Sequence, residues 1–184
     1  MANMDRTKIL IAEEMKNLVE KGKFEKITVQ DLIQKCQISR NTFYYHFKDK
    51  YEVVNWFFAY HMSQIWKKDK EKNFVMEFEQ HLLKTCEHIQ KYRVFYIKIL
   101  QIKAQNSFSG FLRKFFEEKL DEIMTDENLK EYYSEEHKIF VIRFYVDAII
   151  QSINRWADKE MENDPTSFAK IVVKILEREF LLIM

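Results

Sequence analysis

The sequence predicts an all-α fold, and three observations lead to this prediction. The 184 residues include two glycines and one proline, too few for the turns that many strands and hairpins need. Over long stretches the apolar residues recur three and four positions apart, which is the spacing of an amphipathic helix. Apolar residues make up 47% of the chain and aromatic residues 15%, enough to form a buried core. We expect about nine helices.

Composition also limits the compartment and the partners. The two cysteines, Cys36 and Cys86, are too few for a disulfide framework and stand apart from any cluster of metal ligands. No segment looks like a signal peptide, and no apolar run approaches the roughly 20 residues that span a bilayer. We therefore expect a cytoplasmic protein with no membrane partner. Residues 1–50 hold 10 Lys and Arg against 7 Asp and Glu, so the positive excess is N-terminal.

The first two helices are predicted from their boundaries. An apolar stripe with charges on the opposite face indicates a helix over residues 5–21, and Gly22 ends it. Thr28 can cap a second helix over residues 29–36, because Asp31 follows three residues later and can act as its reciprocal partner.

A third short helix is predicted over residues 40–47, capped by Ser39, and a long fourth helix begins at Asp49. The second and third helices, separated by a turn of about three residues, form a helix-turn-helix, in which the second helix of the pair enters the major groove. A small core can close beneath this motif from the apolar residues Val29, Leu32, Ile33, Ile38, Phe43 and Phe47.

The side chains left on the outer face of the third helix are all hydrogen-bond donors, and none is acidic. They are Arg40, Asn41, Thr42, Tyr44, Tyr45 and His46. A helix face that meets only water usually mixes charges of both signs. A nucleic-acid surface therefore explains the absence of acids better. In the alternative register, Tyr44 and Tyr45 would be core aromatics and the two phenylalanines would face outward.

The strongest motif is the run from Ile27 to Val54, ITVQDLIQKCQISRNTFYYHFKDKYEVV. It resembles the DNA-binding signature of the TetR/AcrR family, and the helix from Thr7 onward extends the match to about 50 residues. The family usually has glycine in the turn, where this chain has Gln37. A positive φ at a non-glycine residue there would cost about 1 kcal/mol.

This resemblance implies a sequence-specific transcription regulator of the TetR type whose partner is double-stranded operator DNA. The family's major-groove positions correspond to Arg40, Asn41, Thr42 and Tyr45, and its phosphate contacts correspond to Thr28, Tyr44, His46 and Lys50. The capping residue Ser39 completes the expected DNA-binding set. Chemistry supports this division, since arginine and asparagine can make bidentate contacts to base edges, whereas phosphate contacts orient the protein without reading sequence.

We place residues 1–48 in the DNA-binding domain and residues 49–184 in a helical effector-binding and dimerisation domain. The expected regulator is a repressor whose DNA affinity is modulated by an effector. The C-terminal part more weakly resembles the branch of the family that includes the dihydroxyacetone-kinase regulators. The alternative is therefore an activator or co-regulator controlled by a protein partner instead of a small inducer.

Six amphipathic stretches predict the helices of the larger domain: 49–69, 73–91, 93–104, 108–124, 135–159 and 165–183. The family binds its inducers among the middle helices. Aromatic side chains that could line such a pocket, for a small-molecule or protein effector of unknown identity, are Trp56, Tyr60, Phe74, Phe78, Phe95, Phe111 and Phe115. Each of them is also explained as an ordinary core residue.

A homodimer is expected from the last two predicted helices. In the family these helices form a four-helix bundle across a two-fold axis, and here they carry apolar seams spaced by three and four residues. The residues expected at the dimer interface are Ile142, Val146, Ile149, Ile153, Trp156, Ile171, Ile175 and Phe180. A second apolar set, Phe140, Phe144 and Ala148, lies on another side of the penultimate helix.

Other interpretations have less support. Glu77, His81 and His88 fall on one predicted helix with Cys86 nearby, but a half-buried polar stripe explains them more simply than a metal site, and we expect no metal or other cofactor. The sequence has no phosphate-binding glycine loop, nucleophile elbow or motif of paired carboxylates, so we do not expect an enzyme. A protein-interaction module that has lost DNA binding is a further alternative, and the donor-rich third helix argues against it.

Overall fold

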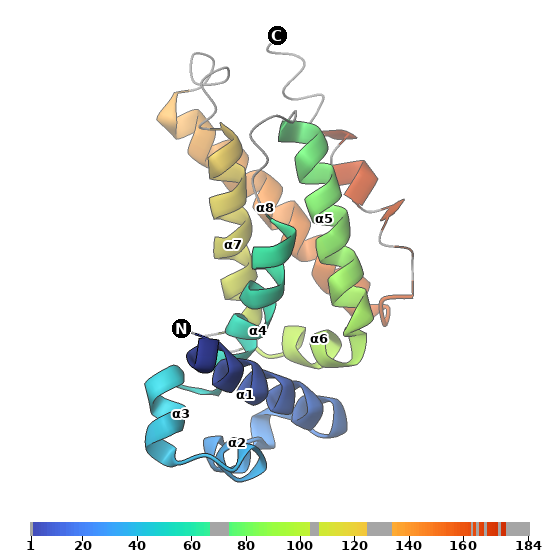
Figure 1. The fold of residues 1–184 in the computed structure, drawn as a ribbon. Helices are drawn as coiled ribbons and strands as arrows, with labels where there is room; N and C mark the ends of the chain where they lie inside the picture. Colours follow the sequence, from blue (N-terminus) through green and yellow to red (C-terminus); the bar gives the residue numbers. More distant parts are fainter. Residues whose placement is uncertain are drawn as a thin grey trace. The chain divides into compact units, whose positions relative to one another are not determined.

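The computed structural model describes residues 2–66, 74–103, 107–124, 134–162, 164, 166–167, 169–172 and 174–175. Across these residues there are eight α-helices with described boundaries, one 3-10 helix, further helical residues between 166 and 175, and no strand, which confirms the all-α prediction (Figure 1). The chain divides into two compact units, one made of residues 1–66 and 94–108 and the other of the remaining residues. The first unit thus contains the whole predicted helix-turn-helix.

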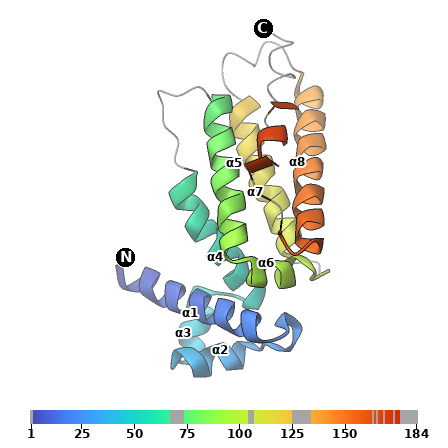
Figure 2. The same cartoon turned by 90° about the vertical axis from the view of Figure 1, so that its right-hand side faces the viewer.

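The first unit contains six helical elements. They are α1 (Ala2–Lys21), the 3-10 helix η1 (Phe24–Lys26), α2 (Val29–Cys36), α3 (Arg40–His46), α4 (Lys50–Ile65) and α6 (Arg93–Leu100), which belongs to the unit from Val94 onward. Figures 1 and 2 show α1 lying across α2 and α3. The predicted boundaries of the first four α-helices are confirmed to within three residues at their N-terminal ends and within four at their C-terminal ends.

The predicted N-caps of the first unit are present. Thr28 and Asp31 form a reciprocal capping box: the Thr28 hydroxyl accepts from the Asp31 amide at 3.2 Å, and the Asp31 carboxylate accepts from the Thr28 amide at 2.8 Å. The bonds that the Asp31 carboxylate accepts from the Thr28 amide and hydroxyl hold the pKa of Asp31 below its ordinary value. Ser39 accepts from the Thr42 amide at 3.0 Å, and Asp49 accepts from the Glu52 amide at 2.8 Å. The capping residues therefore fix where α2, α3 and α4 begin.

Beneath the three N-terminal helices lies a closed apolar core. Its fully buried residues include Ile11, Met15, Val19, Leu32, Phe43, Phe47, Val53 and Phe58. Cys36 is also buried, and burial raises the pKa of its thiol to about 11. The thiol is therefore protonated at neutral pH and acts as a packing group.

The second unit is built around three long helices, α5 (Phe74–Lys91), α7 (Phe108–Met124, in this unit from Ser109) and α8 (Glu135–Asp158), which run along one another in Figure 2. Residues 166–167, 169–172 and 174–175 are also helical. Ser134 caps α8 by accepting from the His137 amide at 3.2 Å, and Asp164 accepts from the Thr166 amide at 3.0 Å.

The apolar seam of α8 lies inside its own chain. Ile142, Val146, Ile149 and Ile153 are between 0 and 7% exposed, because they pack into the core of the second unit. This corrects the prediction that these four residues form a dimer interface. Of the other residues predicted there, Trp156 is partly buried, Ile171 and Ile175 are exposed, and Phe180 lies outside the described residues.

The opposite face of α8 is apolar and exposed. Phe140 is 68% exposed and Phe144 is 59% exposed, and their rings stack with centroids 6.5 Å apart. Ala148, one turn further along the helix, is exposed as well. Large aromatic side chains grouped in this way on a surface usually mark a contact with another molecule.

The polar residues of α5 form no metal-binding group within the described part of the chain. His88 is 8% exposed and its ring meets that of Tyr92 edge-on, and the Thr85 hydroxyl donates to the carbonyl of His81. Cys86 is fully buried, and burial raises the pKa of its thiol to about 12. Of the helices that the structure describes, none combines the length and the hydropathy needed to cross a bilayer.

Candidate nucleic-acid interface

The turn between α2 and α3 depends on a left-handed residue. Gln37 has φ 52° and ψ 43°, which is the left-handed region that a glycine at this position would adopt without strain. The Ile38 amide donates to the carbonyl of Ile33 at 3.2 Å and the Gln37 amide donates to that of Gln34 at 3.3 Å, so these two carbonyls in the last turn of α2 have partners. The turn therefore has the geometry that glycine usually provides, at a cost of about 1 kcal/mol in backbone strain.

Helix α3 presents two different faces. Phe43 is 0% exposed and Phe47, its C-cap residue, is 2% exposed. In contrast, Tyr45 is 75% exposed, and Arg40 and Asn41 are exposed as well. The register in which the two phenylalanines are buried is thus confirmed, and the alternative with Tyr44 and Tyr45 in the core is wrong.

The start of α3 is preorganised by local contacts. The hydroxyl groups of Ser39 and Thr42 lie 2.8 Å apart. The Arg40 guanidinium lies 5.6 Å from the centre of the Tyr44 ring, which itself meets Phe43 edge-on at 5.4 Å. Stacking on an aromatic ring limits the rotamers of an arginine, so less entropy is lost when its planar fork binds another group.

His46, at the end of α3, is partly buried. Its Nδ1 atom is buried and has no hydrogen-bond partner among the described residues. Its ring meets that of Tyr45 edge-on at 5.0 Å. Burial, and secondarily the Lys8 ammonium, lower the pKa of His46 below its ordinary value. The imidazole is therefore mainly neutral at pH 7.

Two of the residues expected at phosphates already use their donors within the chain. The Thr28 hydroxyl lies 2.7 Å from the Asp31 carboxylate, to which it donates. The Lys50 ammonium donates to the carbonyls of Phe24 at 2.9 Å, Glu25 at 3.2 Å and Ile27 at 2.8 Å. Burial lowers the pKa of Lys50. Sequence reasoning missed this internal role of Lys50, because the partners are backbone oxygens that no residue pattern marks.

The electrostatics of α3 suit a polyanion. The helix has no acidic residue. The carboxylate of Asp31 on α2 is hydrogen bonded to both the amide and the hydroxyl of Thr28. An anion approaching α3 thus meets exposed donors and a positive guanidinium.

The seven aromatic residues expected to line an effector pocket are divided between the two units. Trp56, Tyr60 and Phe95 belong to the first unit, and Phe78, Phe111 and Phe115 to the second; the side chain of Phe74 lies outside the described residues. Trp56 and Tyr60 stack at 5.0 Å, while Phe95 and Phe78 are buried core residues. The cavities described in the second unit are lined by other residues.

Comparisons with known proteins agree with this arrangement. Residues 76–178 match a family model described as the transcriptional regulator C-terminal region (TetR_C_8), and residues 16–55 match the model of the bacterial regulatory proteins of the tetR family. The HTH-type dhaKLM operon transcriptional activator DhaS of Lactococcus lactis subsp. lactis is 27% identical over 145 residues, which are 78% of this chain and 75% of DhaS.

Solved structures show the same fold. A structure described as the dihydroxyacetone kinase operon activator DhaS superposes with a TM-score of 0.70 at 23% identity, over 96% of this chain and 97% of that one. The fatty acid degradation regulator FadR from Bacillus halodurans gives 0.67 at 14% identity, over 92% and 94% of the two chains. With more than half of its length matched by one family model and its helix-turn-helix by another, the chain belongs to the TetR family of bacterial transcription regulators.

Proposed function

We propose that the protein recognises a specific operator through α3, as a homodimer, and that Arg40, Asn41, Thr42 and Tyr45 meet base edges in the major groove. One observation carries this proposal: α3 buries Phe43 and Phe47 and leaves an outer face of donors without any acid. Arginine suits guanine and asparagine suits adenine as bidentate partners. Thr28, Tyr44, His46 and Lys50, next to this face in the sequence, are the candidates for phosphate contacts, and of these Thr28 and Lys50 would have to exchange hydrogen bonds within the chain for bonds to phosphate.

Selection of bound sites from a pool of random duplexes tests the proposal. We expect the wild-type protein to enrich one near-palindromic sequence whose half-sites lie about one DNA turn, roughly 34 Å, apart. Failure to enrich any sequence, at a salt concentration where the protein is folded and dimeric, would contradict specific recognition.

The activating mode has the better support. The relative that matches 78% of this chain is named as a transcriptional activator, and a solved structure also named as an operon activator, DhaS, shares the fold over most of both chains. We therefore propose a cytoplasmic activator, instead of the repressor expected from the sequence, with a small-molecule or protein effector acting on the second unit. Transcript levels of the genes beside the selected operator, measured with and without the regulator gene, separate activation from repression.

The exposed face of α8 is the candidate dimer surface. Dimerisation is a property of TetR-type regulators, and the stacked rings of Phe140 and Phe144 are the largest exposed apolar side chains that the structure describes on α8. Ile171 and Ile175, which are 60% and 52% exposed, come from the segment that follows α8. Two copies joined through these surfaces would remove the aromatic rings from water.

Phe144→Glu is expected to convert the dimer to monomers and to weaken operator binding by more than tenfold, because a buried carboxylate opposes the apolar contact. Sedimentation velocity measures the oligomeric state. Gln80→Glu, an equal change of charge at an exposed position of α5, is the control and should remain dimeric. A Phe144→Glu protein that sediments as a dimer would exclude this face.

Operator binding is expected to strengthen as the pH falls through the region below 6.5, because of His46. In the free protein its pKa lies below the ordinary value of 6.5. A neighbouring phosphate would favour the imidazolium and raise the pKa in the complex, so that binding takes up a proton. The affinity should rise between the two pKa values and become constant below the free-protein value.

The folding stability of the free protein should change in the opposite sense. Because the folded-state pKa of His46 is depressed, its contribution is complete above pH 6.5 and is lost as the pH falls through the folded-state pKa. Replacement by glutamine keeps a hydrogen-bond donor but does not titrate. Titrations of wild type and His46→Gln with operator DNA between pH 5 and 8 check the predicted pH dependence of operator affinity. Equal affinity profiles in the two proteins would show that His46 stays neutral in the complex.

A further inference from the structure

Six carbonyl oxygens between the end of α1 and the start of α2 accept hydrogen bonds from two lysines of other helices. Lys98 of α6 donates to the carbonyls of Val19 at 2.9 Å, Glu20 at 2.9 Å and Gly22 at 3.1 Å. Lys50 of α4 donates to three carbonyls of the following residues, as described above. Residues 19–27, here called the α1–α2 connection, are therefore attached to both α4 and α6.

The position of Lys98 suits the end of a helix. The last four carbonyls of an α-helix have no partners within it, and they carry the negative end of its dipole. An ammonium group with three donors satisfies three such oxygens at once. In this chain the donor comes from a helix more than 70 residues later in the sequence, so the hydrogen bonds join two distant segments.

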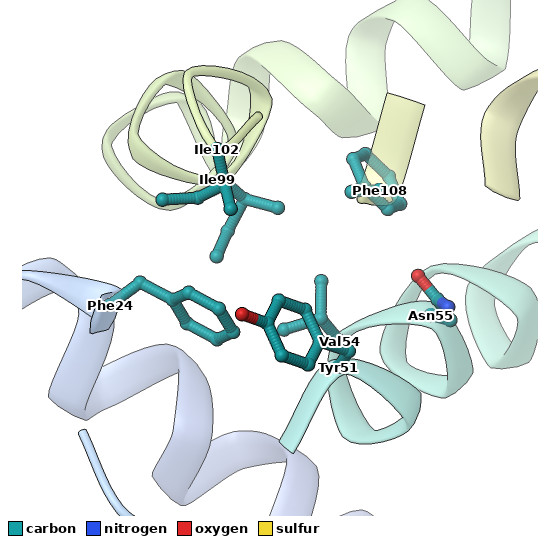
Figure 3. A pocket seen from close by; sticks show the side chains of 7 residues that line it. All are labelled: Phe24, Tyr51, Val54, Asn55, Ile99, Ile102 and Phe108. Atoms are coloured by element: carbon teal, nitrogen blue, oxygen red, sulfur yellow. The ribbon is translucent and has the colours of Figure 1, made fainter. Parts of the chain in front are cut away.

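Apolar packing between α6 and the α1–α2 connection is incomplete. Figure 3 shows Phe24 and Tyr51 across a small space from Ile99 and Ile102, and the cavity between them has a volume of about 10 Å³. A void of this size is close to that of one water molecule, so the side chains on its two sides do not fully interlock. Phe24 and Ile99 are each 2% exposed, so the hydrogen bonds of Lys98 add a polar attachment to an apolar contact that leaves this small gap.

On its other side α6 is packed against α4. Phe95 meets Phe57 edge-on at 5.4 Å, and Tyr96 meets Phe58 edge-on at 6.3 Å, with all four rings buried. Helix α6 is thus a fixed support on α4, and Lys98 joins the α1–α2 connection to that support. The connection ends next to Thr28, the residue that caps α2.

We propose that Lys98 is a positioning residue for operator recognition, and that it fixes the orientation in which α2 and α3 meet DNA without touching DNA itself. This inference rests on the proposed DNA-binding role of α3. If the α1–α2 connection is free to move, the helix-turn-helix loses preorganisation, and the lost entropy is subtracted from the binding free energy.

Lys98→Met tests this role, because methionine keeps an unbranched apolar chain and removes all three donors. We expect the affinity for the duplex selected by the wild-type protein to fall about tenfold at a temperature where circular dichroism shows the variant fully folded. Lys98→Arg should restore most of the affinity, since a guanidinium also donates to several carbonyls. Lys103→Met removes the same charge at an exposed position of the same unit and should bind like wild type.

Two readouts separate positioning from other roles. The slope of log Kd against log salt concentration should not change in Lys98→Met, whereas a slope smaller by about one per subunit would reveal a direct phosphate contact and overturn the inference. The amides of Lys26 and Ile27, which donate to Lys23 and Phe24, should exchange hydrogen faster in the variant, while those of Phe43 and Phe47 should not.

Equally faster exchange throughout the unit would indicate general destabilisation and would overturn the inference. A fully folded Lys98→Met protein that binds the duplex as tightly as wild type would also overturn it, while leaving the DNA-binding role of α3 intact. If the wild-type protein itself enriches no duplex, the proposed function fails instead.

Discussion

Replacing Arg40 with alanine is expected to remove much of the preference for the operator. A bidentate arginine contact discriminates against the wrong base by about 1 to 3 kcal/mol, so each subunit should lose about tenfold to hundredfold in specificity. The side chain is exposed at the first position of α3, and its guanidinium lies against the Tyr44 ring. Its loss should therefore leave the fold unchanged. Fluorescence anisotropy with operator and scrambled duplexes measures both affinities.

Lys50→Ala provides the contrast to Arg40→Ala. If its ammonium reaches phosphate in the complex, the variant should lose the same factor on both duplexes and show a salt slope smaller by about one per subunit. Lys50 also donates to three carbonyls, so the thermal unfolding of the Lys50→Ala variant must be measured together with its DNA affinity. If Arg40→Ala and Lys50→Ala gave the same pattern, the division between base and phosphate contacts would be rejected.

Phe43→Ala is expected to destabilise the first unit by about 3 to 5 kcal/mol, because truncating a fully buried phenylalanine removes apolar contacts and leaves a cavity. Tyr45→Ala, two residues later, should change stability by no more than about 0.5 kcal/mol, since its side chain is 75% exposed. Tyr45→Ala should instead lower the affinity for operator DNA: the folded variant should bind operator more weakly than wild type.

Denaturant unfolding of Phe43→Ala and Tyr45→Ala measures the change in stability. Operator titrations of the folded variants measure the change in affinity. Similar losses of stability in the two variants would mean that α3 does not have one buried and one exposed face. A Tyr45→Ala protein with unchanged operator affinity would remove that tyrosine from the DNA-binding set.

The sequence predicted the helix-turn-helix well because its signals are local. Thr28, Ser39 and Asp49 each place a hydrogen-bond acceptor three residues before an amide that needs one, and this spacing is visible in the sequence. The left-handed backbone of Gln37 could be predicted because the turn geometry demands it, whichever residue is present. The inward direction of Phe43 and Phe47 followed from their separation of one helical turn.

The surface of α8 could not be assigned in the same way. Two apolar stripes run along this helix, and periodicity alone does not tell which one packs within the chain and which one remains for a partner. Val146 and Ile149 are fully buried, while Phe140 and Phe144 are exposed. The choice depends on the shape of the surrounding helices, which the sequence of α8 does not contain.

The roles of the two lysines were also beyond sequence reasoning. Lys50 and Lys98 each donate to three backbone carbonyls more than 20 residues away in the chain, and every residue type provides such an oxygen. A lysine in a motif is therefore easily interpreted by its charge alone. Only the fold shows that these ammonium groups also hold the α1–α2 connection.

The account depends on the outer face of α3 meeting DNA, and photo-crosslinking tests this most directly. A photoreactive phenylalanine analogue would replace Tyr45 in one protein and Tyr60, an exposed tyrosine of α4 in the same unit, in another. With the duplex selected by the wild-type protein, position 45 should crosslink to bases of the half-site and position 60 should not. Crosslinking at position 60 alone, while the protein binds the duplex, would contradict the account.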